Sequence, residues 1–263
     1  MPVLTKTTEK KTTSKTVSST VTSLWVVFNL PLHYGDIQLF REAILHCIKE
    51  DQERIIVSNE DDRKGDKEKN ISTYPVVQFR CHQQKAAIFA IKQGVHIIEK
   101  FLLQYCHADK RKTNPFPWNG DKWHLQDVIK EKENNFEVKL VNPKLRIKPV
   151  VYRLHAWLPF SKDNYENWWK PNRNLSDTEK TKKLEQILTG HLCAFIQHTG
   201  GYIPRHKFKL SILDKDRLKK IFYKEVGQVA FDIRYTVNLL LPERIGLGNH
   251  PAFGFGWQKL ETE

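Results

Sequence analysis

Hydrophobic and polar residues follow two similar series of predicted elements along this chain. The first series opens with a run of strand formers from Ser23 to Leu30, which Pro31 ends. A helix is predicted from Asp36 to Lys49, because apolar residues recur there on one helical face. The series continues with two strands, a second helix and a fourth strand, at Tyr74 to Arg80, Lys85 to Ile91, Gly94 to Tyr105 and Phe136 to Leu140.

The second series repeats this order of elements. Leu145 to Phe160 is predicted to form a long strand or a pair of strands. Ser176 and Glu179 form a capping box that opens a helix, and Gly200 and Gly201 end it. The remaining elements are a strand, a short helix or turn, and a strong strand, at Lys207 to Leu213, Arg217 to Lys224 and Val229 to Leu241.

Each half thus runs strand, helix, strand, strand, followed by a less distinct helix and strand. This order is compatible with two ferredoxin-like, RRM-like α+β units with antiparallel sheets, and also with one larger α+β domain. Residues 1–21 are mostly Thr, Ser and Lys, so a disordered tail is expected. Residues 106–135 are rich in Lys, Pro, Asn and Trp, and we expect an insertion with Trp118 and Trp123 partly anchored.

The charge of the chain favours a negatively charged partner. Its 263 residues include 43 Lys and Arg against 30 Asp and Glu, which gives a formal net charge of +13. This sign and size favour polyanions, chiefly nucleic acid, although many basic proteins bind none. The 7 Trp and 14 Phe residues could stack on unpaired bases, but most such rings are expected in the core.

Cysteine usage and hydropathy exclude several classes of protein. Cys47, Cys81, Cys106 and Cys193 are scattered, with no Cys-x-x-Cys pair and no Cys/His cluster at zinc spacing. We therefore expect free thiols in a reducing, cytoplasmic compartment, with no metal and no cofactor. No apolar run approaches the roughly 20 residues that span a bilayer, and the N-terminal residues include no apolar h-region. We therefore expect neither a secretory signal nor a membrane partner.

The most specific motif is a glycine-rich segment near the C-terminus. Two Gly-apolar-Gly triplets, 246–248 and 254–256, flank a five-residue spacer that carries His250. Successive N–H groups in such a loop can form a concave site for an anion. A dinucleotide-binding fingerprint would need a helix after the loop, and a P-loop would need Gly-Lys-Ser/Thr, so both of these nucleotide-binding motifs are excluded.

The spacing GhGxxxxxGhG, with apolar h, resembles the glycine-rich loop of the CRISPR repeat-processing endoribonucleases, the CRISPR-associated protein six family of the RAMP superfamily. Three further stretches resemble the branch found in methanogens and related bacterial systems: FNLPLHYGDIQLFREAIL, YPVVQF followed by KAAIFAIKQGV, and NLLLPERIGLG. The resemblance covers about residues 22–260, apart from the insertion. It implies tandem ferredoxin-like domains, which we place at 22–142 and 143–263.

The resemblance also implies the reaction, a metal-independent cleavage of CRISPR repeat RNA that turns the precursor into guide RNAs. The 2′-OH attacks the adjacent phosphate, the 5′-oxygen leaves, and a 2′,3′-cyclic phosphate remains. This chemistry needs a base near the 2′-OH, an acid near the leaving oxygen, and cations or N–H groups on the phosphate. Histidine suits the base because its pKa lies near working pH.

Candidate catalytic residues come from the same resemblance. The matching branch carries catalytic histidines after the first helix, where this chain has Ser58 and Glu60. Other branches place a histidine, often with a tyrosine, between the first strand and the first helix. His33 is therefore the candidate base, Tyr34 the candidate that orients the phosphate, and His46 a second candidate on the exposed helix face. His82, after the Tyr74 to Arg80 strand, is a weaker candidate.

Candidate RNA-binding residues lie in the glycine-rich segment and in two basic stripes. Basic residues alternate with apolar ones from 144 to 148 and again from 205 to 210, so each stretch is predicted to be a strand with one basic face. Ordinary solvated strand faces would show the same pattern. The predicted RNA contacts are Gly246, Gly248, His250, Gly254, Gly256, Lys144, Arg146, Lys148, Arg205, Lys207 and Lys209.

Three functions remain open at this point. The leading hypothesis is an endoribonuclease that matures guide RNAs, with CRISPR repeat RNA as its partner and other CRISPR effector subunits as further candidate partners. The alternative is a catalytically inactive subunit of the same fold that binds repeat RNA without cutting it. A small-molecule enzyme that uses the glycine-rich segment is a third hypothesis, and it predicts nucleotide binding and no affinity for RNA.

Overall fold

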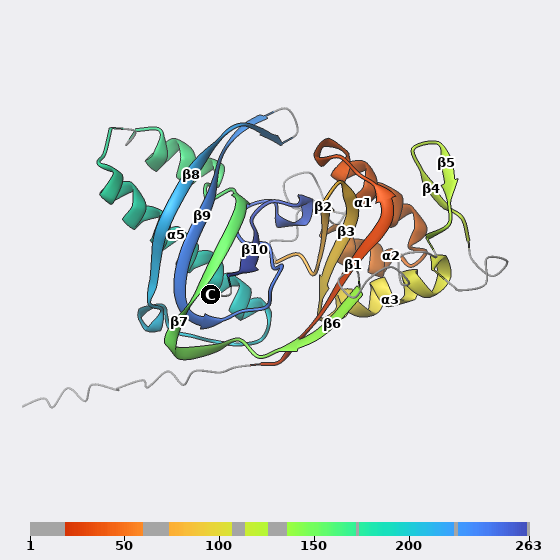
Figure 1. Cartoon of the computed structure of the whole chain (residues 1–263), viewed down its shortest axis with the longest axis horizontal. Coiled ribbons are helices and arrows are strands. Elements are labelled where there is room, and N and C mark those ends of the chain that lie inside the picture. Colours follow the sequence, from red (N-terminus) through yellow and green to blue (C-terminus); the bar gives the residue numbers. More distant parts are fainter. Residues whose placement is uncertain are drawn as a thin grey trace, which may run out of the picture.

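The chain folds into two lobes, each built on a four-stranded antiparallel sheet (Figure 1). The structure is a computed structural model that describes residues 19–59, 74–106, 114–125, 136–171, 174–223 and 226–261. Most of the predicted tail, Glu60 and two parts of the predicted insertion lie outside the described residues. The mixture of helices and antiparallel sheets confirms the predicted α+β class.

The N-terminal lobe has the strand order of a ferredoxin-like unit. Its sheet order is β2-β3-β1-β6, and the chain alternates between sheet and helix as β-α-β-β-α-β. The predicted strands and helices are all found, with bounds that shift by a few residues at most. They are β1 (Val21–Pro31), α1 (Ile37–Cys47), β2 (Val77–His82), β3 (Lys85–Ile91), α3 (Gln93–Tyr105) and β6 (Phe136–Val141).

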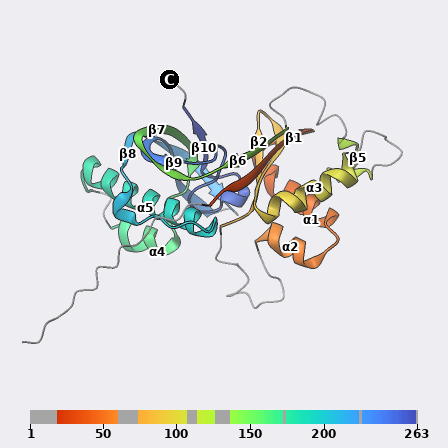
Figure 2. The same cartoon turned by 90° about the horizontal axis from the view of Figure 1, so that it is seen from below.

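Helices cover only the outer face of this sheet. In both views α1, α2 (Asp51–Ser58) and α3 lie on the side away from the second lobe (Figures 1 and 2). Phe40 of α1 is fully buried, and its ring centroid lies 5.8 Å from that of Phe28 and 5.9 Å from that of Phe79. The opposite face of the sheet is therefore left to meet the C-terminal lobe.

Some elements of this lobe were not predicted. In chain order, they are the 3₁₀ turn η1 (Tyr34–Asp36) after β1, the helix α2 (Asp51–Ser58), and the hairpin of β4 (Phe116–Trp118) and β5 (Asp121–Trp123). The hairpin lies in the predicted insertion. Trp118 is buried and Trp123 is partly buried against the core, so the expected anchoring of these two rings is confirmed.

The C-terminal lobe repeats the same strand order with one helix fewer. Its sheet order is β10-β7-β9-β8, and between β9 and β10 the chain forms only the short 3₁₀ turn η6. The glycine-rich segment thus occupies the connection in which a ferredoxin-like unit has its second helix. The elements are β7 (Lys144–Trp157), α4 (Lys162–Asn164), η4 (Tyr165–Trp169), α5 (Asp177–His198), η5 (Arg205–Lys207), β8 (Leu210–Tyr223), β9 (Val226–Leu240), η6 (Pro251–Phe253) and β10 (Trp257–Leu260).

The long helix α5 begins and ends where the sequence predicts. The Ser176 hydroxyl accepts a hydrogen bond from the Glu179 N–H, and the Glu179 carboxylate accepts one from the Ser176 N–H. Gly200, with a φ of +85°, follows the last turn, a conformation that favours glycine. The capping box and the glycine stop are both confirmed.

Two predictions in this lobe are wrong. The stretch predicted as a short helix or turn from Arg217 to Lys224 is strand as far as Tyr223, because β8 runs through it and pairs with β9 along a long hairpin, and Lys224 lies outside the described residues. The strand predicted to begin at Lys207 begins at Leu210 instead. Pro204 starts a tight 3₁₀ turn before it, in which the Lys207 N–H donates to the Pro204 carbonyl. Cross-strand pairing with β9 decided the first case, and local turn geometry decided the second.

Candidate nucleic-acid interface

The glycine-rich segment fills the junction between the two lobes. It leaves β9, passes against β2 of the N-terminal sheet, and returns as β10 at the edge of the C-terminal sheet. The Gly246 N–H donates to the buried Gln78 Oε1 on β2 at 2.9 Å. The predicted loop is therefore a contact between the two domains as well as a surface feature.

Steric contact explains why the segment needs glycine. Gly248, Gly254 and Gly256 have φ values of +101°, +84° and +64°, which side chains rarely adopt. A Cβ at Gly256 would lie 1.9 Å from the Leu247 carbonyl oxygen, and one at Gly246 would lie 2.9 Å from Gln78 Oε1. The backbones at these positions pass too close to their neighbours to leave room for a side chain.

Several N–H groups of the segment are already used inside the protein. Leu247 donates to the Gly256 carbonyl at 2.7 Å, Gly256 to the Ala156 carbonyl at 3.1 Å, and Asn249 to the Leu158 carbonyl at 2.9 Å. The glycines thus fix the shape of the junction. Direct contact of RNA with Gly246, Gly248, His250, Gly254 and Gly256 stays a prediction; Gly248 and His250 are partly exposed.

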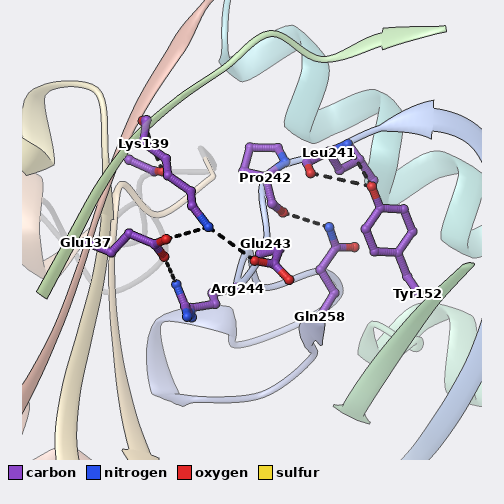
Figure 3. Close-up of polar contacts among 9 residues, drawn as sticks. Glu137, Lys139, Tyr152, Leu241, Pro242, Glu243, Arg244 and Gln258 are labelled. Atoms are coloured by element: carbon purple, nitrogen blue, oxygen red, sulfur yellow. Dashed lines mark hydrogen bonds and ion pairs between the residues drawn. The ribbon is translucent and has the colours of Figure 1, made fainter. Parts of the chain in front are cut away.

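Ion pairs tie the start of the segment to the N-terminal sheet (Figure 3). Glu137 on β6 pairs with Arg244 and also with Lys139, whose Nζ lies 2.5 Å from Glu137 Oε1. Lys139 reaches Glu243 as well, at 3.5 Å. From the other lobe, Gln258 on β10 donates its amide to the Pro242 carbonyl at 2.9 Å. The segment is held from both sheets at once.

A buried cation lies at the centre of the junction. Arg80 on β2 is 3% exposed, and its Nη2 donates to Gln78 Oε1 at 2.6 Å. Its Cζ lies 5.5 Å from the Phe89 ring centroid and 5.9 Å from that of Trp257. In the part of the chain that the structure describes, its Nε and Nη1 have no hydrogen-bond partner. Burial lowers the pKa of Arg80, yet guanidinium keeps its charge.

The predicted pair His33 and Tyr34 lies beside this junction. His33 is exposed and precedes the turn η1. The Tyr34 hydroxyl donates to the Gly254 carbonyl at 3.4 Å, so this side chain reaches the glycine-rich segment. Burial raises the pKa of Tyr34, and the positive charge of Arg80 opposes that rise. The structure therefore brings Tyr34 together with the glycine-rich segment, as the candidate site requires.

The structure separates His46 from this group. His46 is exposed near the end of α1, whereas Ile37, at the start of α1, packs against Gly254. At about 1.5 Å per residue, His46 lies about 13 Å further along the helix axis than Ile37. Ser58 ends α2, and its hydroxyl donates to the Ile55 carbonyl at 3.2 Å. Neither residue therefore places an imidazole at the junction, since His46 lies too far along α1 and residue 58 is a serine.

The first predicted basic stripe lies on a strand, as expected, whereas the second does not. Lys144, Arg146 and Lys148 lie at the start of β7 and are all exposed, but Ile147 between them is fully exposed too. Strand pairing is interrupted between Leu145 and Val150, so Leu145 is partly buried against the core while Ile147 is not covered.

The second stripe is not a strand face. Arg205 and Lys207 belong to the 3₁₀ turn η5, and Lys209 precedes β8, so the predicted alternation on one strand is wrong. The three side chains are exposed. Their contact with RNA stays a prediction that no longer rests on strand periodicity.

Sequence reasoning missed Arg80, Arg244 and Trp257 at the junction, and it gave His82 little weight. A signal for two of these residues was present. Gln78, Arg80 and His82 alternate with Phe79 and Cys81 along a strand, so one face of β2 is polar while the other is apolar. In an otherwise apolar lobe, a polar sheet face of this kind indicates a surface that meets something other than the core.

The described ranges contain neither a metal-binding cluster nor a membrane span. There, no group of three or more His, Cys, Asp or Glu side chains is placed to hold a metal ion. No helix among the same residues is long and apolar enough to cross a membrane.

Comparison with known proteins identifies relatives of both lobes. Family models described as the Cas6b N-terminal domain and the Cas6b C-terminal domain match residues 20–114 and 144–259, together more than half of the chain. No curated protein sequence matches the chain.

Solved structures with the same fold include two described as Cas6b. One has a TM-score of 0.69 at 18% sequence identity. The other, described as a CRISPR RNA processing endoribonuclease, has a TM-score of 0.59 at 17% identity. Each match covers 92% of this chain and 100% of the solved chain. Csf5, a type IV CRISPR-Cas Cas6 crRNA endonuclease, has a TM-score of 0.50 at 11% identity and covers 93% of this chain and 100% of its own. These likenesses confirm tandem ferredoxin-like domains.

Alanine at a crowded glycine of the segment should destabilise the fold more than alanine at an uncrowded glycine elsewhere in the chain. We expect Gly256→Ala to cost at least about 1–3 kcal/mol in free energy of unfolding, because a Cβ there meets backbone in a left-handed conformation. Gly35→Ala is the matched control, since a Cβ at Gly35 meets nothing within 4 Å. Denaturant unfolding of both variants measures the difference, and equal stabilities would contradict the steric role of Gly256.

Proposed function

The chain belongs to the Cas6b family, and from this premise we propose that it binds CRISPR repeat RNA at the junction of its two domains and cleaves it there. The observation that carries the proposal is the chemistry gathered at that junction. Arg80, Arg244 and Lys259 supply positive charge, while Tyr34 and Trp257 supply partly exposed rings beside it. Cations that meet phosphates, next to rings that stack on unpaired bases, suit single-stranded RNA.

The proposed reaction is an internal transfer of the phosphodiester. His33 takes the proton from the 2′-OH, and the oxygen attacks the adjacent phosphorus. The bond from phosphorus to the 5′-oxygen then breaks, and that oxygen takes a proton from an acid or from water. The products are a 2′,3′-cyclic phosphate and a 5′-OH end, and no step needs a metal ion. Tyr34 orients the phosphate from its place against Gly254.

The second candidate is a subunit that binds the repeat RNA without cutting it, and holds it for other CRISPR effector subunits. One observation favours this candidate. The branch that the sequence resembles carries catalytic histidines after the first helix, where this chain has Ser58, a residue that ends α2 and cannot titrate near neutral pH. The two candidates share the junction and differ only in whether His33 supplies the base.

Incubating the purified chain with its CRISPR repeat RNA in excess EDTA tests the proposal. We expect cleavage at a single position, and a 2′,3′-cyclic phosphate on the upstream product, detected by its resistance to a ligase that needs a free 3′-OH. Retention of intact RNA in a gel-shift assay would instead support the binding subunit. Failure both to bind and to cut would overturn the proposed function.

Replacing His33 should remove cleavage and leave binding in place. A general base contributes about 10²–10⁴-fold to a rate, so His33→Ala should lose that much in single-turnover cleavage while RNA affinity changes little. His96→Ala is the control, because His96 is an exposed histidine on α3 that faces Glu99. A wild-type rate in His33→Ala would remove His33 from the mechanism, and His46→Ala would be measured next.

Salt dependence tests the basic start of β7. Each contact between a cation and a phosphate of single-stranded RNA adds about 0.7 to the slope of log affinity against log salt. Replacing Lys144, Arg146 and Lys148 together by Ala should therefore lower the slope by about 2. Ala at Lys49, Lys122 and Lys182, all three exposed and none of them on β7, controls for the loss of three positive charges. A slope equal to wild type in the triple variant would show that this strand does not contact RNA.

A further inference from the structure

We propose that His82, Arg244 and Lys259 form a binding site for one phosphodiester group of unpaired RNA, built against the ring of Trp25. This inference rests on the proposed RNA-binding function and adds to it a contact that the sequence motifs do not assign. It requires no cleavage, so it also applies to a subunit that only binds.

The ring of Trp25 brings the first two residues together. Trp25, on β1, is 4% exposed and therefore fixed in the sheet. The His82 ring meets it edge-on, with centroids 5.4 Å apart and planes at 87°. The Arg244 Cζ lies 5.0 Å from the centroid of the same ring. His82 and Arg244 thus flank one rigid platform, His82 from the end of β2 and Arg244 from the segment after β9.

The charged side chains that act on the pKa of His82 are cations. Arg80 on β2, Arg244 and Lys259 on β10 all act on the imidazole electrostatically, and each disfavours its protonated form. Glu137 on β6 pairs with Arg244, but the same carboxylate also pairs with Lys139. Glu243 also pairs with Lys139, so these two carboxylates balance Arg244 and Lys139, and the excess of positive charge comes from Arg80 and Lys259.

Because of this excess of positive charge, binding of an anion and protonation of His82 each favour the other. Burial and the three cations lower the pKa of His82, so its ring is neutral at physiological pH in the free protein. A bound phosphate would offset the cations and raise the pKa of His82, so binding takes up a proton. Affinity should therefore increase as pH falls through the pKa of the bound state, and the dependence should vanish without the imidazole.

The exposed rings nearby favour RNA over free phosphate. Trp257 is partly exposed on β10, and His155 stacks on it with ring centroids 4.5 Å apart. Tyr34 is half exposed on the N-terminal side of the same junction. A free phosphate would use only the cations, whereas an unpaired nucleotide can also place its base against these rings.

Histidine titration by NMR on the full chain tests the site. The His82 imidazole signal is assigned by its loss in His82→Gln and is followed against pH in the free protein, in inorganic phosphate, and with a uridine octamer RNA. We expect the octamer to raise the pKa of His82, and inorganic phosphate at equal phosphate concentration to raise it less. The His96 signal serves as the control and should not move. An unchanged His82 pKa at saturating octamer would overturn the proposal, and an equal rise in inorganic phosphate would overturn its assignment to RNA.

Affinity measurements complete the test. Lys259→Ala should weaken octamer binding about tenfold, the typical loss for one hydrogen bond to a charged group. This variant should fold normally because Lys259 is exposed. His82→Gln should lose the pH dependence of binding, with its melting temperature measured beside it. Octamer binding that moves His82, without cleavage of repeat RNA, would refute the nuclease and keep this site. Cleavage of the repeat RNA with an unchanged His82 pKa would support the nuclease and refute this site.

Discussion

The buried amide of Gln78 is the contact on which the junction depends. Its Oε1 accepts hydrogen bonds from the Gly246 N–H of the glycine-rich segment and from Arg80, while its Nε2 donates to the Tyr74 hydroxyl at 2.7 Å. One fully buried side chain thus joins the N-terminal sheet, the connection of the C-terminal unit and the central cation. An unpaired amide there would cost about 1–3 kcal/mol, so these partners must move as one.

This constraint explains why the segment is both glycine-rich and fixed. In the connection between β9 and β10, the backbone leaves no room for side chains at the glycine positions, since a Cβ at Gly256 would lie 1.9 Å from the Leu247 carbonyl oxygen. The backbone itself reaches β2, and Arg244 and Trp257 at the two ends of the segment face the N-terminal sheet. The glycines therefore serve the site by bringing charged and aromatic neighbours into it.

Local sequence predicted most elements, since their periodicity reports burial on one face, as in α1 and α5. It failed where pairing with the next strand decides, as for Arg217 in the long hairpin of β8 and β9. The candidate site was predicted in part: Tyr34 does meet the glycine-rich segment, 220 residues away in sequence. The sequence could not show that Arg80 and His82 lie near Arg244, because only tertiary packing brings β2 and the segment after β9 together.

The buried guanidinium of Arg80 gives the junction of the two domains a positive electrostatic potential. A buried charge without an ionic partner costs several kcal/mol, and the rings of Phe89 and Trp257 offset only part of that cost. What remains is a positive potential that opposes protonation of His82 and the rise in the Tyr34 pKa. Folding has already positioned and desolvated this charge. A phosphate that enters the junction therefore meets an arrangement complementary to it, without the reorganisation that flexible surface lysines would need.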